Sequence, residues 1–423
     1  MYLTDRSTPQ AAGTEQGRRR GPGPRVAPVV LVLGTVSLIT DISSEMVTAV
    51  LPLYFVTTLG FSPLGFGALD GLYNGVSALV QLTGGHLADR VRNHKLMAGL
   101  GYGLSALCKP LLLLASSIGT LGTVLALERT GKGLRTAPRD AMISLSTPSE
   151  KQGRAFGVHR AMDTTGAMLG PLAAFFILRA AADGYDAVFG VSACVAALGV
   201  LVLVLFVPGR RQDARQDEAG AADGRPPVRV REALDLLRLP RLRALAGCAA
   251  LLGLTTVSDA FVYLLLQRRA GIGEQWFPLL PLGTAAVFLL LAVPVGALAD
   301  RVGRHVVFLA GHVALLVGYA LLLWAPATPV LPCVVLALHG VFYAATDGVL
   351  PAALADIVPA QLRASGLAIV GTSQALARFC CSLAFGAAWT VWGDGPALAG
   401  SAVGLLCCAM VAGTVLRPAG DTR

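Results

Sequence analysis

Residues 128–142 read ERTGKGLRTAPRDAM, a charged stretch within a chain that is otherwise largely apolar. The apolar run TLGTVLAL leads directly into it. The stretch is either a solvated loop between two membrane spans or a span that carries charge for a purpose. The choice decides the number of spans and therefore the fold. Its ionisable side chains are Glu128, Arg129, Lys132, Arg135, Arg139 and Asp140.

The composition places the chain among membrane proteins. It has 423 residues, of which 54% are hydrophobic and only 14% are charged, and its mean hydropathy is +0.66. Roughly a quarter of the residues of a soluble domain are charged. The apolar runs are about twenty residues long, which suffices for a helix to cross a bilayer. They are continuous rather than alternating, which disfavours strands. The sequence predicts a polytopic all-α membrane protein.

The net charge of +9 is distributed by position along the chain. Lys and Arg gather in alternate connections, whereas TTLGFSPLG, ASSIGT and APATP carry neither. This positive-inside pattern predicts that both termini lie in the cytoplasm and that the protein spans the cytoplasmic (inner) membrane. Arg179 and residues 267–271 go against the pattern. Because the positive charge follows the membrane topology, we expect no nucleic-acid partner. The basic connections are residues 17–25, 89–95, 149–154, 209–243 and 300–305.

Two sets of six apolar runs predict twelve transmembrane helices. The first set is expected at 27–58, 64–88, 96–118, 119–145, 154–180 and 184–207. The second is expected at 242–267, 275–299, 305–325, 329–354, 363–389 and 395–417. The predicted organisation is a disordered cytoplasmic tail at 1–25, a six-helix bundle at 26–208, a cytoplasmic linker at 209–240, a second bundle at 241–417 and a tail at 418–423.

The two sets are related by an internal repeat. GHLADRV at 85–91 recurs as GALADRV at 296–302, and RAFG at 154–157 recurs as RASG at 363–366. Both pairs are offset by about half the chain, which indicates a duplicated six-helix unit with two pseudo-symmetric bundles. The counterpart of the charged stretch is LALHGVFYAATDGVLPAAL, which is apolar enough to span. The charged stretch is therefore predicted to be a span.

The repeated loop resembles the signature G-x-L-a-D-R-x-G-R-[RK] of the major facilitator superfamily. The resemblance implies twelve helices, alternating access and a loop aspartate that caps a neighbouring helix, where a negative charge is favoured by about 0.3–1 kcal/mol. Ordinary turn chemistry is the alternative. The first copy departs from the signature at Arg92 and Asn93. The gating residues implied by the resemblance are Gly85, Asp89, Arg90, Gly296, Asp300, Arg301, Gly303 and Arg304.

The fifth span resembles the antiporter signature of the same superfamily, G-x8-G-x3-G-P-x2-G-G. Gly157, Gly166, Gly170 and Pro171 match, whereas Ala174 and Phe175 replace the last two glycines. Glycines at this spacing let helices approach closely, and proline bends a span. The resemblance implies export in exchange for protons; generic helix packing is the alternative.

Charges in the first and fourth spans predict a polar cavity. A charged side chain in mid-membrane costs about 2.5–3.5 kcal/mol on insertion scales, so it faces the bundle interior or water. Asp41 and Glu45 lie one turn apart. A rise of about 1.5 Å per residue places Asp41 near the depth of Arg129 or Lys132, so we expect the two helices to face each other. The spacing of four, three and four puts Glu128, Lys132, Arg135 and Arg139 on one helical face.

The resemblance also implies that the first, fourth, seventh and tenth helices line the transport path. Asp41 and Glu45 are the first candidates for a proton site, because proximity of a cation controls whether a buried carboxylate holds its proton. A structural ion network is the alternative. Further proton candidates are Asp259, His339 and Asp347. The expected cavity residues are Glu128, Arg129, Lys132, Arg135, Tyr263, Tyr343 and Arg378. Asp70, Asn74 and Gln81 are expected to border the cavity, with helix–helix hydrogen bonding as the alternative. Lys109 is interpreted as a partner of a kink at Pro110, and His159, Arg160 and Asp163 as part of the gate.

These patterns predict a secondary transporter that exports a small organic compound, drug or metabolite, in exchange for protons. The alternatives are uptake of an anionic solute with protons, with Lys132 and Arg135 as its ligands, and a receptor that moves nothing. The sequence has no P-loop, G-x-S-x-G elbow or H-E-x-x-H, so we expect neither an enzyme nor ATP hydrolysis. The eight cysteines lack metal-ligand spacing. We expect a monomer with no cofactor or metal, whose partners are its substrate, protons and lipid.

Overall fold

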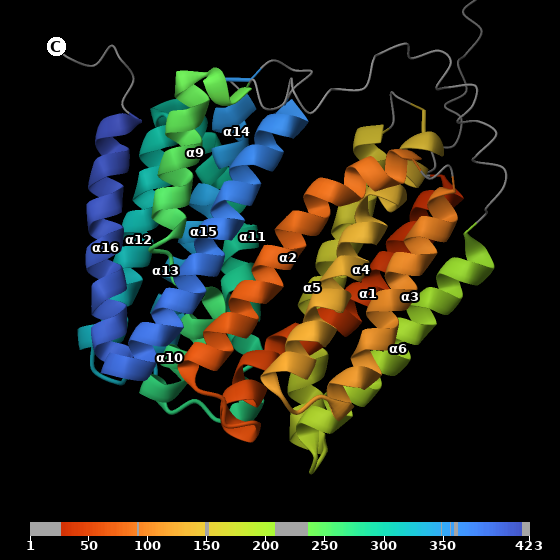
Figure 1. Cartoon of the computed structure of the whole chain (residues 1–423), viewed down its shortest axis with the longest axis horizontal. Coiled ribbons are helices and arrows are strands. Elements are labelled where there is room, and N and C mark those ends of the chain that lie inside the picture. The colour runs from red at the N-terminus through yellow and green to blue at the C-terminus, as the bar shows by residue number, and fades with distance from the viewer. Residues whose placement is uncertain are drawn as a thin grey trace, which may run out of the picture.

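The computed structural model describes residues 27–90, 93–148, 152–207, 236–347, 349–355, 357–358 and 363–416. Within these ranges the regular structure is entirely helical, and the helices form two groups side by side (Figure 1). The tails predicted at 1–25 and 418–423, and most of the linker predicted at 209–240, fall outside the described residues.

The first group contains the six helices predicted for the first half. The charged stretch lies inside an uninterrupted helix, which confirms that it is not a loop. This helix begins with a capping box, in which the side chains of Ser117 and Thr120 each accept the other's backbone N–H. The helices are α1 (Pro28–Leu53), which continues into a π-helical turn η1 (Tyr54–Thr58), then α2 (Pro63–Arg90), α3 (His94–Leu114), α4 (Ile118–Leu145), α5 (Gln152–Ala180) and α6 (Gly184–Phe206).

The second group differs from the prediction at two spans. The expected seventh span is divided into α9 (Pro240–Gly253) and α10 (Asp259–Ala270), and the expected tenth into α13 (Leu331–Thr346) and α14 (Val349–Ala355). A short 3₁₀ turn, η3 (Leu236–Arg238), precedes α9, and η4 (Glu274–Trp276) precedes α11. The remaining helices are α11 (Leu279–Val302), α12 (Arg304–Trp324), α15 (Arg363–Trp392) and α16 (Asp394–Val415).

Hydroxyl groups account for the break between α9 and α10. The side chains of Thr255 and Thr256 both donate to the Leu252 carbonyl, at 3.1 and 2.9 Å, and compete with the helical pattern. The backbone groups freed by the break find side-chain partners. The Val257 N–H donates to the Tyr319 hydroxyl at 2.8 Å, and the Cys381 thiol contacts the Thr256 carbonyl at 3.3 Å.

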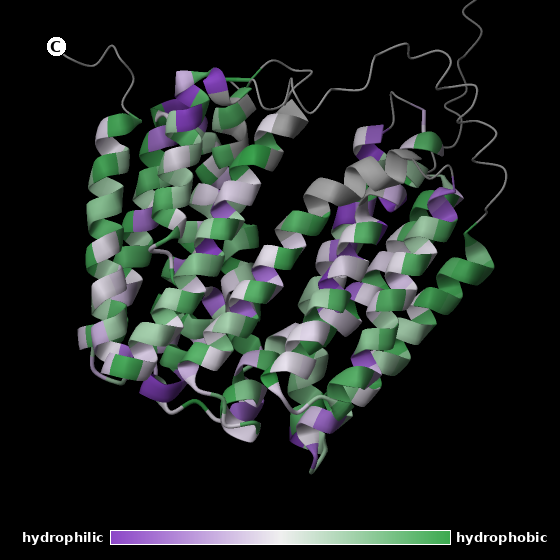
Figure 2. Cartoon of the chain, in the orientation of Figure 1, coloured by the Kyte–Doolittle hydropathy of each residue, from purple (hydrophilic) through white to green (hydrophobic). Residues whose placement is uncertain are grey.

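Eight helical segments of the described chain are long and apolar enough to cross a membrane. Figure 2 shows hydrophobic residues along the outer helices of both groups. The helices α2 and α4 and the two divided spans are not among the eight, because polar residues or breaks interrupt them. The twelve-span topology and the orientation of the termini stay predictions. The eight segments are Pro28–Thr58, His94–Leu114, Gln152–Ala180, Gly184–Phe206, Glu274–Val302, Arg304–Trp324, Ile369–Trp392 and Asp394–Val415.

The two groups meet at one end. We call the end where α6 stops and α9 begins the linker end, and the opposite end, which carries the connections at 59–62 and 271–278, the far end. The helices α2 and α15 pack closely against each other (Figure 1). Near the far end the Ser382 hydroxyl donates to Asp70 at 2.6 Å, and the Leu64 N–H donates to Thr390 at 3.0 Å. Phe175 also stacks on Trp276 there, with ring centroids 5.0 Å apart.

Candidate functional site

A cavity of about 410 Å³ lies between the two halves. Small-molecule sites commonly have volumes of about 300–1,000 Å³. The cavity is lined mainly by α1, α2, the break before α10, α10 and α11, with single residues from α4, α5, α13 and α15 and with Asp347 just after α13. Both halves therefore contribute to one site, as alternating access requires.

The ionisable lining of the cavity is mainly acidic. One cation, Arg378, accompanies four carboxyl groups among the described residues, and seven aromatic rings form much of the remaining wall. Carboxylates and aromatic faces both attract cations. The acids are Glu45, Asp70, Asp259 and Asp347, and the rings are those of Phe55, Phe66, Tyr73, Tyr263, Phe277, Phe288 and Tyr343.

Asp259 is the most extensively hydrogen-bonded of these acids. It is the first residue of α10, and an anion is favoured at the N-terminus of a helix. Tyr343 donates to both of its carboxylate oxygens at 2.6 Å, and His339 Nε2 lies 3.0 Å from Oδ1. His339 and Tyr343 lie one turn apart on α13, which brings both to the same carboxylate. His339 is therefore a hydrogen-bonded partner of Asp259, and Asp259 faces the cavity.

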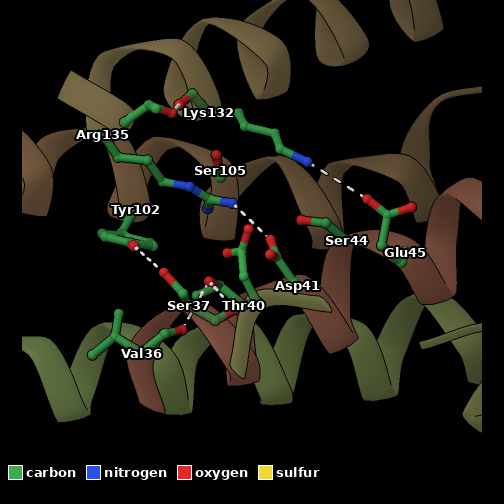
Figure 3. Close-up of polar contacts among 12 residues, drawn as sticks. Val36, Ser37, Thr40, Asp41, Ser44, Glu45, Tyr102, Ser105, Lys132 and Arg135 are labelled. Atoms are coloured by element: carbon green, nitrogen blue, oxygen red, sulfur yellow. Dashed lines mark hydrogen bonds and ion pairs between the residues drawn. The ribbon is translucent and has the colours of Figure 1, made fainter. Parts of the chain in front are cut away.

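The acids of α1 face the bases of α4, as expected (Figure 3). Lys132 Nζ lies 3.5 Å from Glu45, and Arg135 Nη2 lies 3.4 Å from Asp41. The Glu45–Lys132 pair is partly exposed, with 27% and 36% of the side chains accessible, whereas only 3% of the Arg135 side chain is. Of these four residues only Glu45 lines the cavity.

The register of this contact differs from the prediction by one helical turn. Asp41 was expected near Arg129 or Lys132, but it contacts Arg135. The helices are antiparallel, and their relative depth depends on how far each extends beyond the core. Arg135 also lies over the ring of Tyr102, 4.6 Å from its centroid, and the Tyr102 hydroxyl lies 3.3 Å from Ser37 (Figure 3).

The other charges of α4 are held behind the cavity wall. Glu128 contacts Lys109 of α3 at 3.3 Å and Arg129 at 2.6 Å, and all three side chains are almost fully buried. The expectation that Glu128, Arg129, Lys132 and Arg135 line the cavity is not met in this structure, because ion pairs turn them toward α1 and α3; α4 contributes Leu125 instead. Lys109, considered on sequence only as a partner of a kink, is the counter-ion of Glu128.

Arg129 lies behind the cavity wall and contacts an aromatic ring that lines the cavity. Its guanidinium lies 3.9 Å from the centroid of the Tyr73 ring, and the Tyr73 hydroxyl is 3.0 Å from Thr48 Oγ1. Tyr73 and Thr48 line the cavity. The sequence analysis missed Tyr73, although it lies on the same face of α2 as Asp70 and Asn74, which also line the cavity. Its spacing of three from Asp70 could have identified it.

A second polar network lies nearer the linker end. Arg139 contacts Asp140 at 3.0 Å and Asp163 at 3.6 Å, and it donates to Ser37 at 3.3 Å. His159 Nε2 lies 3.1 Å from the same hydroxyl. Arg160, 70% exposed, contacts Asp163 at 4.0 Å. This network joins α1, α4 and α5.

Two glycines of the antiporter-like motif allow α5 to pack tightly on α1. A Cβ at Gly166 would lie 2.5 Å from the Leu38 carbonyl oxygen, and one at Gly170 would lie 2.7 Å from the Met46 nitrogen and 2.9 Å from Glu45 Cβ. These contacts flank Asp41 and Glu45. A Cβ at Gly157 would meet nothing within 4 Å. Pro171 lines the cavity.

The loop signature is described in its second copy. Gly303 has φ of +102°, a conformation that favours glycine, and it separates α11 from α12. Asp300 contacts Arg304 at 3.4 Å and does not cap α12, which has no side-chain cap. Gly296 and Arg301 lie in the last turns of α11. The side chains of Gln81, Gly85, Asp89 and Arg90 lie outside the described part of α2.

Comparison with known proteins identifies the family. A model of the Major Facilitator Superfamily matches residues 33–379 and, in a second match, residues 279–423. The chain belongs to the Major Facilitator Superfamily. It is therefore a multi-pass membrane transporter of small molecules, which agrees with the expectation that it is not an enzyme.

Relatives and solved structures support this assignment. An uncharacterized MFS-type transporter of Methanocaldococcus jannaschii is 29% identical over 388 residues, covering 89% of this chain and 92% of the relative. The multidrug resistance protein MdtH of Photorhabdus laumondii is 29% identical over 180 residues, covering 41% and 43%. Among solved structures, the nucleoside transporter NupG has a TM-score of 0.76 at 14% identity, covering 92% of this chain and all of NupG. An inward-facing, occupied bacterial homolog of the human lysosomal transporter Spinster has a TM-score of 0.69 at 16% identity, covering 93% and 97%.

Proposed function

We propose that this transporter exports a cationic or neutral aromatic organic compound across the cytoplasmic membrane in exchange for protons. The observation that carries the proposal is the wall of the central cavity, with four carboxyl groups, seven aromatic rings and one guanidinium. Drugs and metabolites with an amine and a ring fit this chemistry. The proposal retains the predicted direction and coupling, and it narrows the class of substrate.

The cavity favours a cation over an anion. An anion would have to approach several carboxylates at distances where like charges repel by about 1 kcal/mol per pair even in water, and by more in a less polar site. The cations of α4 do not compensate, because Lys109, Arg129 and Arg135 are buried beside Glu128 and Asp41. Lys132 is the exception, and it is shared with Glu45.

Competition for one carboxylate explains the exchange. A carboxylate that holds a proton has lost the charge that binds a cationic substrate, so proton and substrate exclude each other at that group. A carrier that alternates between two openings then moves the two in opposite directions. Glu45 in the first half and Asp259 in the second are the candidates, because each faces the cavity and has a partner that can hold it in place, Lys132 and Tyr343 respectively.

The closed end bears on the side from which the cavity is reached in this state, whereas the export direction is carried over from the antiporter-like motif. The halves contact each other at the far end, through Asp70–Ser382 and Phe175–Trp276. If the positive-inside pattern gives the orientation, the far end is outside the cell and the cavity is reached from the cytoplasm in this state. The partly matching MdtH is named a multidrug resistance protein, which fits an organic compound as the substrate.

Everted membrane vesicles test the proposal. With an acidic interior established, addition of ethidium, a cationic aromatic dye, is expected to dissipate the proton gradient only in vesicles that contain the protein. The double variant Glu45→Gln/Asp259→Asn is expected to abolish this response, whereas Asp394→Asn, an exposed acid at the start of α16, leaves it intact.

Two outcomes would overturn the proposal. Uptake of the anionic dye carboxyfluorescein into right-side-out vesicles, driven by protons, would favour the anion symporter suggested by the cationic α4. Absence of any gradient response or exchange with a panel of cationic aromatic dyes, with binding retained, would favour a receptor that does not transport.

A further inference from the structure

A second chamber of about 150 Å³ lies within the second half and adjoins the central cavity. Thr256, Asp347 and Arg378 line both spaces and thus form the wall between them. Its remaining walls come from α9, α12, α13, α14 and α15, all in the second half. The chamber is therefore separate from the gap between the halves through which a substrate reaches the central cavity.

The chamber extends from mid-membrane depth toward the linker end. Along α15 its lining runs from Arg378 to Leu367, which is eleven residues or roughly 16 Å at about 1.5 Å per residue. The helix begins only one turn further on, at Arg363. The chamber thus spans most of the distance between the central cavity and the linker end.

The lining of the chamber suits water. A volume of about 150 Å³ accommodates on the order of five waters at about 30 Å³ each, and a cavity of this size holds water only if polar groups line it. The described lining supplies six polar side chains at the inner part and an apolar collar nearer the linker end. The polar side chains are Thr256, His312, Thr346, Asp347, Gln374 and Arg378, and the collar consists of Leu350, Leu354, Leu367 and Val370.

Titratable groups face the chamber from several elements. Asp347 follows α13, His312 lies on α12 with Nδ1 2.8 Å from the Phe308 carbonyl, and Arg378 comes from α15. On the other side of the wall Asp259 and Tyr343 face the central cavity with Asp347. A file of waters between these groups would connect the carboxylates of the cavity to the apolar collar, and only the collar would then separate this water from the linker end.

We infer that this chamber is a water-filled route by which protons pass between the central cavity and the linker end, apart from the path of the substrate. The inference rests on the proposed exchange with protons. In this state the substrate enters between the two halves, whereas protons enter or leave through the second half. A shared wall containing Asp347 and Arg378 separates the two paths.

Hydroxyl-radical footprinting of the purified protein in nanodiscs tests for the water. Radicals formed from bound water oxidise adjacent side chains, so Phe308 and Phe342, buried but lining the chamber, are expected to react at least about tenfold faster than Phe189, which is buried in the first half and lines neither cavity. Equal rates for the three phenylalanines would show a dry chamber and overturn the inference, whatever the transported substrate is.

A filled chamber tests for the proton route. Gly371 lines the chamber, and a Cβ there would meet nothing within 4 Å, so Gly371→Leu is chosen to place an apolar side chain in the space. In proteoliposomes we expect transport of ethidium driven by a pH gradient to fall at least tenfold, while ethidium–ethidium exchange, which needs no net proton movement, stays within twofold. The control Gly400→Leu, on an exposed and unobstructed face of α16, should leave both unchanged.

The outcomes separate this inference from the proposed function. Wild-type coupling that Gly371→Leu does not affect overturns the route alone. If Gly371→Leu reduces exchange and gradient-driven transport equally, the position has a structural role, and the proton route is again overturned. A wild-type protein that exchanges ethidium but ignores a pH gradient overturns both the proton exchange and this route.

Discussion

The phenol of Tyr343 donates to both carboxylate oxygens of Asp259 at 2.6 Å, and through them it links α13 to the first turn of α10. Since a non-helical segment separates α9 from α10, this contact fixes the start of a short helix beside the cavity. The acid that we assign to proton exchange is thus also the acid that holds two elements of the second half together.

Removing this carboxylate is expected to abolish coupled transport. Asp259→Asn should abolish ethidium transport driven by a pH gradient and should weaken ethidium exchange as well, because the same charge binds the cationic substrate. Tyr343→Phe removes one hydrogen bond to a charged group, worth about 1.5–3 kcal/mol, and should slow gradient-driven transport about tenfold or more. Both are measured in proteoliposomes. Tyr54→Phe, in the core of the first half, is the control; an equal effect there would contradict the prediction.

Breaking the buried pair between α1 and α4 is expected to destabilise the first half. Arg135→Ala leaves Asp41 as a buried, unpaired acid, at a cost of about 3–5 kcal/mol. Arg160→Ala removes an exposed partner of Asp163 and should change stability by no more than about 0.5 kcal/mol. Unfolding in detergent, followed by the loss of helical signal in circular dichroism, measures both. Similar stabilities of the two variants would show that the Asp41–Arg135 pair is not structural.

Lys109 and Glu128 are expected to be energetically coupled. Each neutralises a charge of the other within the buried cluster, so Lys109→Met and Glu128→Gln should together cost less than the sum of the two single variants. A coupling free energy of about 0.5–3 kcal/mol is expected from a double-mutant cycle of unfolding. Strict additivity would mean that the contact at 3.3 Å contributes nothing to folding.

The glycine at position 170 is expected to tolerate no larger side chain. Gly170→Val places a branched side chain against Met46 and Glu45 of α1 and should cost about 1–3 kcal/mol while displacing the Glu45 carboxylate. Gly157→Val, at the unobstructed glycine of the same motif, is the matched control. Unfolding in detergent and gradient-driven ethidium transport measure the effect. A variant at 170 that behaves like the one at 157 would refute close packing of α5 on α1.

Closure at the far end depends on glycines of α2. A Cβ at Gly67 would collide with the Ser382 carbonyl, so Gly67→Leu should open the far end and shift the population away from the closed state. Spin labels on non-natural amino acids at Ser116 and Thr328, in far-end connections of opposite halves, should then report longer distances. Gly119→Leu, where nothing lies within 4 Å, should keep the wild-type distribution. An unchanged distribution for Gly67→Leu would contradict the role of this contact.

The sequence predicted the positions of the helices and the facing of α1 and α4, because both follow from hydrophobic length and from the cost of unpaired charge in a membrane. The repeat correctly identified residues 128–142 as helix. The break at 254–258 was not predicted, since threonine also occurs in continuous helices. The backbone groups that the break frees, the Thr256 carbonyl and the Val257 N–H, are satisfied by Cys381 and Tyr319, which are far away in sequence.

The lining of the cavity could be predicted only in part. Glu45, Asp259 and Tyr343 were expected there, but the same reasoning assigned Glu128 and Arg129 to it. Which neighbouring helix a helical face points toward depends on how the helix is rotated about its own axis. For α4 this rotation is set by its packing on α3. No local pattern distinguishes a cation that faces a substrate from one that pairs with Glu128.

The interruption between α9 and α10 gives the second half a pivot. Thr256 lies in the interruption and belongs to the walls of both hollow spaces. Residues of α10 line the central cavity and residues of α9 line the second chamber, so a small change of angle at this joint would alter the shape of both spaces. A single mechanical element could thus coordinate the passage of the solute with that of the ion, without any signal travelling across the molecule.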